Sequence, residues 1–154
     1  MLPPIHVPVG TAPAYWGPGD LYRFLITGAQ TGGSYFTLEA FVPPGGGPPL
    51  HIHHREDEMF YILEGECSIQ IGDARRQAKT GDLVSAPRGV AHAYRNESAN
   101  QLRMLVTFTP AGMDEYFFKT LETARELTAA PPDVRQRVIE RFVAFADQFG
   151  VEFV

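Results

Sequence analysis

Three of the five histidines of this chain lie within four residues, at His51, His53 and His54. Successive side chains of a β-strand point to opposite faces, so the imidazoles of His51 and His53 would share one face. Two neutral imidazoles on one face can bind a single metal ion. A lone His-x-His sequence is nevertheless a weak signal and is more often a surface feature. His54 and the remote His6 are expected to be exposed and unliganded.

Glu58 follows His53 by five residues, which is the wrong parity for the same face of an uninterrupted strand. The polar stretch 54–57 could reverse the chain and place Glu58 on a neighbouring strand, opposite the histidine pair. His92, far along the chain, would then complete a shell of three imidazoles and one carboxylate, which suits a divalent transition metal. Taken singly, Glu58 would most often be a solvated carboxylate and His92 a hydrogen-bonded residue without a metal.

The full spacing of these residues is similar to the two sequence motifs of the cupin family. The first motif, a glycine, His-x-His, a glutamate and a second glycine, is matched by Gly45, His51, His53, Glu58 and Gly65. The second motif, a glycine, Pro-x-Gly, a histidine and an asparagine, is matched by Gly81, Pro87, Gly89, His92 and Asn96. This resemblance implies a double-stranded β-helix in which His51, His53, Glu58 and His92 are the metal ligands.

The elements that must position these residues are short strands. Between about residues 20 and 110, alternating apolar and polar runs are separated by Gly, Pro, Asn and Asp, which indicates antiparallel strands. Strands are expected over residues 21–28, 34–42, 58–63, 66–71, 82–86, 91–95 and 101–109. Glu64-Gly65 is expected to form a hairpin turn. This spacing predicts an all-β sandwich or barrel, and the resemblance specifies the cupin jelly-roll barrel.

The sequence period changes after Gly112. A helix is expected over residues 113–127, and a second one after the Pro131-Pro132 break, with Asp133 capping its first turn. The second helix has one apolar stripe, made of Val134, Val138, Phe142, Phe145 and Phe149, and Gly150 is placed to end it. We predict a cupin β-barrel domain over residues 1–112. A C-terminal helical extension over 113–154 would pack on the barrel or on a second subunit, without a chemical role.

Side chains that share a face with the metal ligands are expected to line a cavity. Alternation along the strands selects Phe36, Leu38, Phe60, Ile62, Tyr94, Met104, Val106 and Phe108. Such a cup would be aromatic and mostly dry, and would suit an apolar or aromatic ligand. The alternative is that these side chains simply fill a small barrel.

Composition and charge narrow the class of protein. A length of 154 residues with 44% hydrophobic residues is typical of one globular domain, and the net charge of −5 disfavours nucleic acid as a partner. The only cysteine, Cys67, excludes an intrachain disulfide. Neither a secretory signal nor an apolar segment of membrane-spanning length is evident. We expect a cytoplasmic protein that binds a small molecule. The aromatic Tyr15-Trp16 segment and the amphipathic last helix favour a homodimer.

Three histidines and one glutamate would leave coordination positions open on an ion such as Fe, Mn, Ni, Co, Cu or Zn, and would favour an anionic oxygen donor such as an enolate. The pattern resembles metal-dependent cupin dioxygenases, and the helical extension resembles that of small cupins described as quercetin 2,3-dioxygenase-like. This implies a dioxygenase acting on a hydroxylated aromatic or enol compound, with Glu58 both a ligand and a base. Two alternatives stay open: a non-catalytic binding module, and a metal-assisted isomerase or hydrolase.

Overall fold

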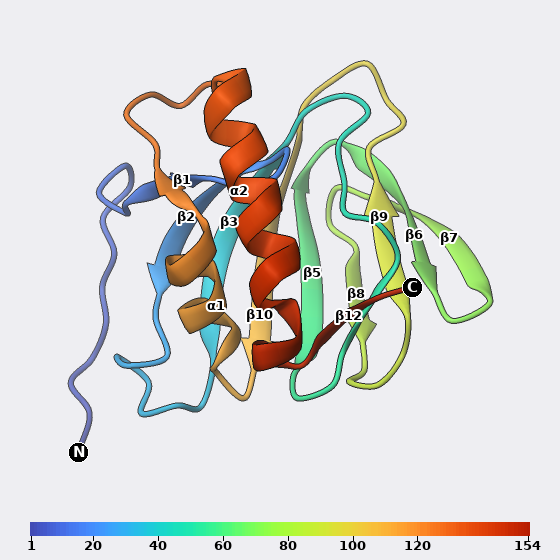
Figure 1. Ribbon diagram of the computed structural model, residues 1–154. Coiled ribbons are helices and arrows are strands. Elements are labelled where there is room, and N and C mark those ends of the chain that lie inside the picture. The colour runs from blue at the N-terminus through green and yellow to red at the C-terminus, as the bar shows by residue number, and fades with distance from the viewer.

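Two antiparallel β-sheets make up most of the computed structural model, which describes residues 1–154 (Figure 1). The seven-stranded sheet has the order β11 (Glu122–Thr123), β1 (Ala14–Trp16), β2 (Leu21–Ile26), β3 (Phe36–Val42), β10 (Leu102–Thr109), β5 (Asp57–Glu64) and β8 (Leu83–Ala86). The five-stranded sheet has the order β12 (Val151–Phe153), β4 (His51–His53), β9 (His92–Arg95), β6 (Glu66–Ile71) and β7 (Ala74–Lys79). The predicted all-β class is confirmed.

The core lies between the two sheets, toward which the central strands direct most of their apolar side chains. Strand β10 alternates along its whole length, with Leu102, Met104, Val106 and Phe108 buried. Its pairing with β3 and β5 places Val106 beside Leu38 on one side and beside Phe60 on the other. The inward faces of three adjacent strands therefore form one continuous apolar wall.

The prediction of a hairpin turn at Glu64-Gly65 is wrong. Strands β5 and β6 lie in different sheets, and Gly65, with φ of 89°, turns the chain from one sheet to the other. Most other residues would be strained at this backbone angle. The hairpin is instead formed by β6 and β7, which pair along their full length. The sequence did not indicate β7 because its residues are mostly exposed and lack apolar alternation.

The helix expected over residues 113–127 is shorter in the structure. Helix α1 spans Met113–Thr120, after which Glu122–Thr123 forms the edge strand β11 beside β1. The pairing of β11 with Tyr15 and Trp16 replaces the continuation of the helix. Trp16 itself is buried and its indole N–H donates to the carbonyl of Thr128. The Tyr15-Trp16 segment is thus used inside the subunit, which removes one reason for expecting a homodimer.

Helix α2 spans Pro132–Phe145 and continues as a short 3-10 helix, Ala146–Phe149. Its N-cap is Pro131, so the expected capping by Asp133 is wrong; Asp133 instead pairs with Arg137 at 2.9 Å. Gly150 ends the segment in the left-handed conformation, as predicted. Neither helix has the length and apolar character needed to cross a membrane.

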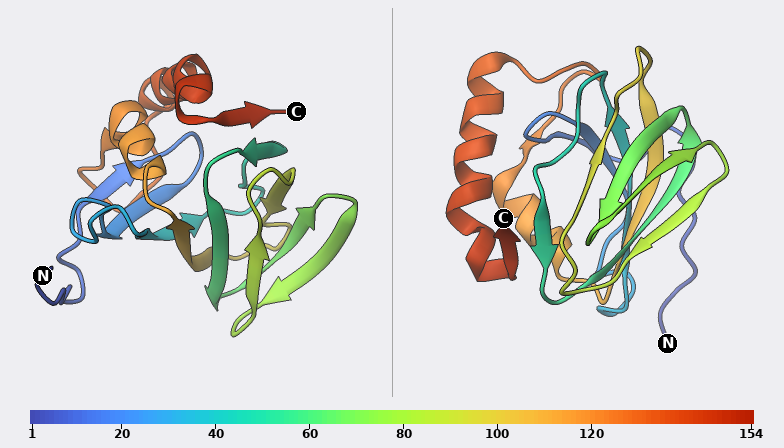
Figure 2. Two further views of the ribbon diagram at one scale, coloured as in Figure 1. Left: turned by 90° about the horizontal axis from the view of Figure 1, so that it is seen from below. Right: turned by 90° about the vertical axis from the view of Figure 1, so that its right-hand side faces the viewer.

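Both helices lie on one side of the molecule, next to β1 and β2, and the β6–β7 hairpin lies on the opposite side (Figure 2). The apolar stripe of α2 faces the barrel: Val138 is fully buried, and the Phe142 ring packs on Tyr116 of α1 with centroids 4.7 Å apart. After Gly150 the chain forms β12, which pairs with β4. The C-terminal segment, residues 113–154, therefore adds a strand directly beside the histidine strand.

Candidate metal centre

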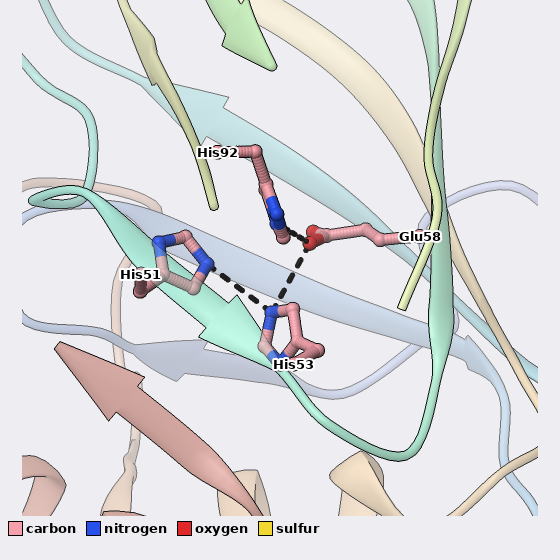
Figure 3. A group of neighbouring side chains, drawn as sticks. All are labelled: His51, His53, Glu58 and His92. Atoms are coloured by element: carbon pink, nitrogen blue, oxygen red, sulfur yellow. Dashed lines mark hydrogen bonds and ion pairs between the residues drawn. The ribbon is translucent and has the colours of Figure 1, made fainter. Parts of the chain in front are cut away.

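Two sheets bring four side chains together. His51 and His53 alternate with Ile52 on β4 and both point inward, and the antiparallel pairing of β4 with β9 sets His51 opposite His92. Glu58 comes from β5 in the facing sheet. The stretch after His53 does turn the chain, as expected, but it carries the chain across to the other sheet rather than to a neighbouring strand. Figure 3 shows the four side chains converging.

The ligand atoms are close enough to share one ion. The four atoms lie within 4.8 Å of one another, and all four residues are buried. The Oε2 atom of Glu58 is 2.8 Å from His92 Nε2 and 3.1 Å from His53 Nε2, and the Nε2 atoms of His51 and His53 are 3.1 Å apart. Bonds of about 2.0–2.2 Å from one ion place adjacent ligand atoms about 3 Å apart. The donor set therefore fits a single divalent cation.

Backbone carbonyls orient two of the imidazoles. His51 Nδ1 lies 2.8 Å from the Pro49 carbonyl, and His92 Nδ1 lies 2.9 Å from the Val90 carbonyl. A carbonyl can only accept, so Nδ1 carries the hydrogen in both rings and Nε2 is directed to the centre of the cluster. His92 Nε2 then faces the carboxylate of Glu58, which is also an acceptor. Either a proton or a metal cation must lie between these two atoms.

Charges within the cluster set its protonation without a metal. Burial alone would raise the pKa of Glu58, but hydrogen bonds and charges from His53 and His92 outweigh burial and lower that pKa to about 2. Burial and the neighbouring His53 lower the pKa of His51 to about 4. For His92, burial acts to lower the pKa, yet the hydrogen bond that it donates to Glu58 and the charge of that carboxylate raise the pKa overall. Glu58 is thus ionised and His51 neutral at pH 7, the forms that bind a metal.

A small space of about 60 Å³, the inner cavity, adjoins the cluster. Of the residues expected to line a cavity, the structure places Leu38, Tyr94, Val106 and Phe108 on its wall. The other four, Phe36, Phe60, Ile62 and Met104, do not line it and are fully buried in the packed core. Those four side chains fill the interior of the barrel, which was the alternative to lining a cavity.

The C-terminal segment, for which the sequence suggested no chemical role, supplies much of the cavity wall. Its contributions are Met113, Tyr116, Phe117, Phe142, Val151 and Phe153, and Tyr22 and Pro48 add to the wall from elsewhere. The alternation of Val151 and Phe153 after Gly150 was a strand signal that could have indicated two of them. His6 and His54 are exposed, as expected, and His54 lies 2.7 Å from Glu152.

Comparison with known proteins agrees with this geometry. The family model described as "Cupin domain" matches residues 38–108. Quercetin 2,3-dioxygenase of Bacillus subtilis is 25% identical over 146 residues, which cover 90% of this chain and 43% of that protein. A probable oxidoreductase, virH of Hypocrea virens, is 34% identical over 74 residues, covering 46% of this chain and 34% of that protein. The chain spans about half the length of the curated relatives it matches.

Solved structures share the fold. KdgF from Halomonas sp. has a TM-score of 0.63 and 16% identity, over 73% of this chain and 98% of that one. A predicted oxalate decarboxylase from Thermotoga maritima also has a TM-score of 0.63, with 21% identity, over 69% of this chain and 99% of that one. At such identities the likeness establishes the jelly-roll architecture, and the activity has to be argued from the site.

Proposed function

This chain belongs to the cupin superfamily, and on that premise we propose that it is a mononuclear metal-dependent oxidoreductase of the dioxygenase type. Its substrate would be a hydroxylated aromatic or enol compound. The observation that carries the proposal is the convergence of His51, His53, Glu58 and His92 on one point beside an otherwise largely apolar cavity. The similarity to a quercetin dioxygenase over most of the chain supports this class of substrate.

The four side chains would hold one divalent ion, with His51, His53 and His92 binding through Nε2 and Glu58 through a carboxylate oxygen. Such an ion supplies Lewis-acid polarisation of a substrate oxygen and a centre for reaction with dioxygen. The protein's own contribution is to fix the imidazoles through the Pro49 and Val90 carbonyls and to keep the site buried.

Glu58 would also accept the hydroxyl proton of the substrate. It is the only carboxylate that lines the inner cavity, and its charge is maintained at neutral pH because its pKa is about 2. A base must lie within hydrogen-bond reach of the proton it removes, and a substrate oxygen entering this cavity meets that condition. The surroundings of Glu58 in this cavity are apolar, among them Phe108 and Val106.

Dioxygen consumption tests the proposal. Metal-free protein would be reloaded separately with iron, manganese, nickel or cobalt and mixed with flavonols and catechols in an oxygen electrode. We expect uptake in at least one metal form, and its loss in Glu58→Gln and His92→Ala. Glu152→Gln is the matched control, since that carboxylate is exposed and pairs only with His54. Absence of uptake with every metal and compound would refute the dioxygenase assignment.

The alternatives have distinct outcomes in the same assay. Ligand binding without any turnover would identify a non-catalytic binding module, and turnover without oxygen consumption would identify an isomerase or hydrolase.

The homodimer and the cytoplasmic location stay predictions. Light scattering at micromolar concentration would decide the former, with a monomer mass contradicting it.

A further inference from the structure

Three of the metal-ligand candidates, His51, His53 and Glu58, line the inner cavity, and few other side chains on its wall are polar. These few are three phenols, those of Tyr22, Tyr94 and Tyr116. The Tyr116 hydroxyl donates to the carbonyl of Phe142 at 2.6 Å, so its hydrogen is already bonded within the protein and is not available to a ligand. The other two phenols converge on a single carboxylate, that of Asp20.

Asp20 is buried, with 7% of its surface exposed. Its Oδ2 atom accepts from the Tyr94 hydroxyl at 2.8 Å and from the Tyr22 hydroxyl at 3.4 Å. Its Oδ1 atom is buried without a partner, and lies 3.1 Å from where a β-carbon would stand at Gly46. A carboxylate in this position can only accept hydrogen bonds when it is ionised, so it fixes the direction in which both phenol hydrogens point.

This direction determines what the phenols offer to a ligand. Each hydroxyl has one hydrogen and two acceptor lone pairs. Because both hydrogens point to Asp20, the oxygens of Tyr22 and Tyr94 retain only acceptor capacity toward the cavity. A ligand group that donates a hydrogen, such as a hydroxyl, would therefore be favoured beside them, and an ether oxygen would meet only other acceptors.

The position of Tyr22 places this cluster at an entrance. A second space, the outer groove, has a volume of about 870 Å³ and lies between α2 and the Gly/Pro-rich loop 43–49. Tyr22, Pro48, Phe142 and Phe153 line both the groove and the inner cavity, so the two spaces meet at these residues. Pockets for drug-sized ligands usually have about 300–1,000 Å³. A flavonol-sized compound that reaches the metal site must extend past Tyr22 into the groove.

We propose that Asp20, Tyr22 and Tyr94 form an acceptor subsite that selects substrates with a free hydroxyl at the neck between the inner cavity and the outer groove. This inference rests on the proposed function and narrows its substrate class to compounds with one oxygen at the metal site and a second, donating hydroxyl at the neck. Methylation of that second hydroxyl removes the donor and adds bulk.

Equilibrium binding to the zinc-loaded protein tests this subsite without turnover. The probes are flavonols that each carry one further ring hydroxyl, together with the corresponding methyl ethers. We expect at least one hydroxylated probe to bind about tenfold or more tightly than its ether, the ratio typical of one hydrogen bond in a buried site. Tyr22→Phe should reduce that ratio severalfold.

Two further variants sharpen the test. Asp20→Asn introduces an amide that donates as well as accepts, which frees a phenol hydrogen to point into the cavity, so the preference should shift toward the ether. Tyr116→Phe removes a phenol hydroxyl from the same cavity, but one already committed to Phe142, so the ratio of the two affinities should stay as in the unsubstituted protein.

The outcomes separate this inference from the proposed function. Equal affinities for every hydroxyl and ether pair would overturn the subsite even if dioxygen uptake is observed. Hydroxyl selectivity that depends on Tyr22 would support the subsite even if no uptake is found. A ratio that Tyr116→Phe changes as much as Tyr22→Phe does, or the absence of binding by any probe, would also overturn it.

Discussion

His51 lies directly opposite His92 across the antiparallel pair of β4 and β9, with ring centroids 4.5 Å apart. This single register contact joins two residues that stand 41 positions apart in the chain, one from each motif. It also depends on the C-terminal segment, because β4 is three residues long and its other edge is covered by β12. The geometry of the metal site is therefore a property of the whole five-stranded sheet.

Metal retention is expected to depend on pH through His92. Its pKa is raised because the hydrogen bond and charge of Glu58 outweigh burial, so the metal must displace a proton from His92. Below that pKa the apparent metal affinity should fall by about tenfold for each pH unit. His51, with a pKa of about 4, is neutral over this range and adds little to the slope.

Chelator competition between about pH 5.5 and 8.5 measures this dependence, because the raised pKa of His92 lies above the ordinary imidazole value of about 6.5. The control is His54→Ala, because His54 is exposed and outside the cluster; the variant should give the same profile. An affinity that is constant over this interval would contradict the role of His92 as a ligand that exchanges a proton for the metal.

Asp20 should make stability fall as pH rises. Burial raises its folded-state pKa from 3.8 to about 6, against the hydrogen bonds from Tyr94 and Tyr22. The folded protein thus binds this proton more tightly than the unfolded chain does. The resulting stabilisation is fully present below the unfolded pKa and is lost as pH rises through the folded pKa, by up to about 3 kcal/mol.

Asn cannot ionise, so urea unfolding of Asp20→Asn and of the unsubstituted protein at several pH values isolates this contribution. The variant should gain stability relative to the unsubstituted protein between about pH 4 and 7. A difference in unfolding free energy that does not change with pH would show that Asp20 titrates normally.

Two valines of helix α2, one buried and one exposed, test how this helix packs. Val138 is fully buried and Val143 is 64% exposed on the same helix. Val138→Ala should lower the free energy of unfolding by about 2 kcal/mol, because it removes buried methyl groups and leaves a cavity. Val143→Ala should change it by less than about 0.5 kcal/mol. Equal losses, measured by urea unfolding, would mean that the other face of α2 is also covered, for example by a second subunit.

Much of the fold, and the shared face of His51 and His53, could be predicted from the period-two rule, whereas Glu58 and His92 were indicated by the spacing of the cupin motifs. The buried set Phe36, Leu38, Ala40 and Val42 of β3 is the alternating set in the sequence. His51 and His53 share a face for the same reason. Alternation gives the inward direction of a side chain but no information about depth. Phe60 and Ile62 point inward like Glu58, yet they pack solidly instead of lining the cavity.

Contacts between distant segments account for what the sequence did not indicate. Residues 121–127 have helical character locally, but the pairing of Glu122 and Thr123 with β1 overrides it. Strand β7 is an edge strand that contributes only Ala78 to the core, so it carries no apolar pattern. The role of Phe142 and Phe153 in the cavity depends on how the C-terminal segment docks, which helical periodicity alone cannot specify.

The Gly/Pro-rich loop should be intolerant of a side chain where it crosses β9. A β-carbon at Gly47, where φ is 133°, would overlap with the Tyr94 carbonyl oxygen. Gly47→Ala must displace β9 and should lower both stability and metal affinity. Gly81→Ala is the control, since Gly81 also has a positive φ, of 94°, but has no atom within 4 Å. Gly81→Ala should lower the free energy of unfolding by about 1–2 kcal/mol, the cost of a positive φ for alanine, and should leave the metal affinity unchanged. Equal effects on metal affinity would show that the loop does not position β9.

The number of metal ions bound per chain tests the central claim most directly. Purified protein would be loaded with excess zinc, freed of unbound ion by gel filtration and measured by elemental analysis, with circular dichroism as the check on folding. Four converging ligands predict about one ion per folded chain, its loss in His51→Ala and in His92→Ala, and its retention in His54→Ala. A folded His51→Ala or His92→Ala protein that still holds about one ion, or an unsubstituted protein that holds none, would contradict the account.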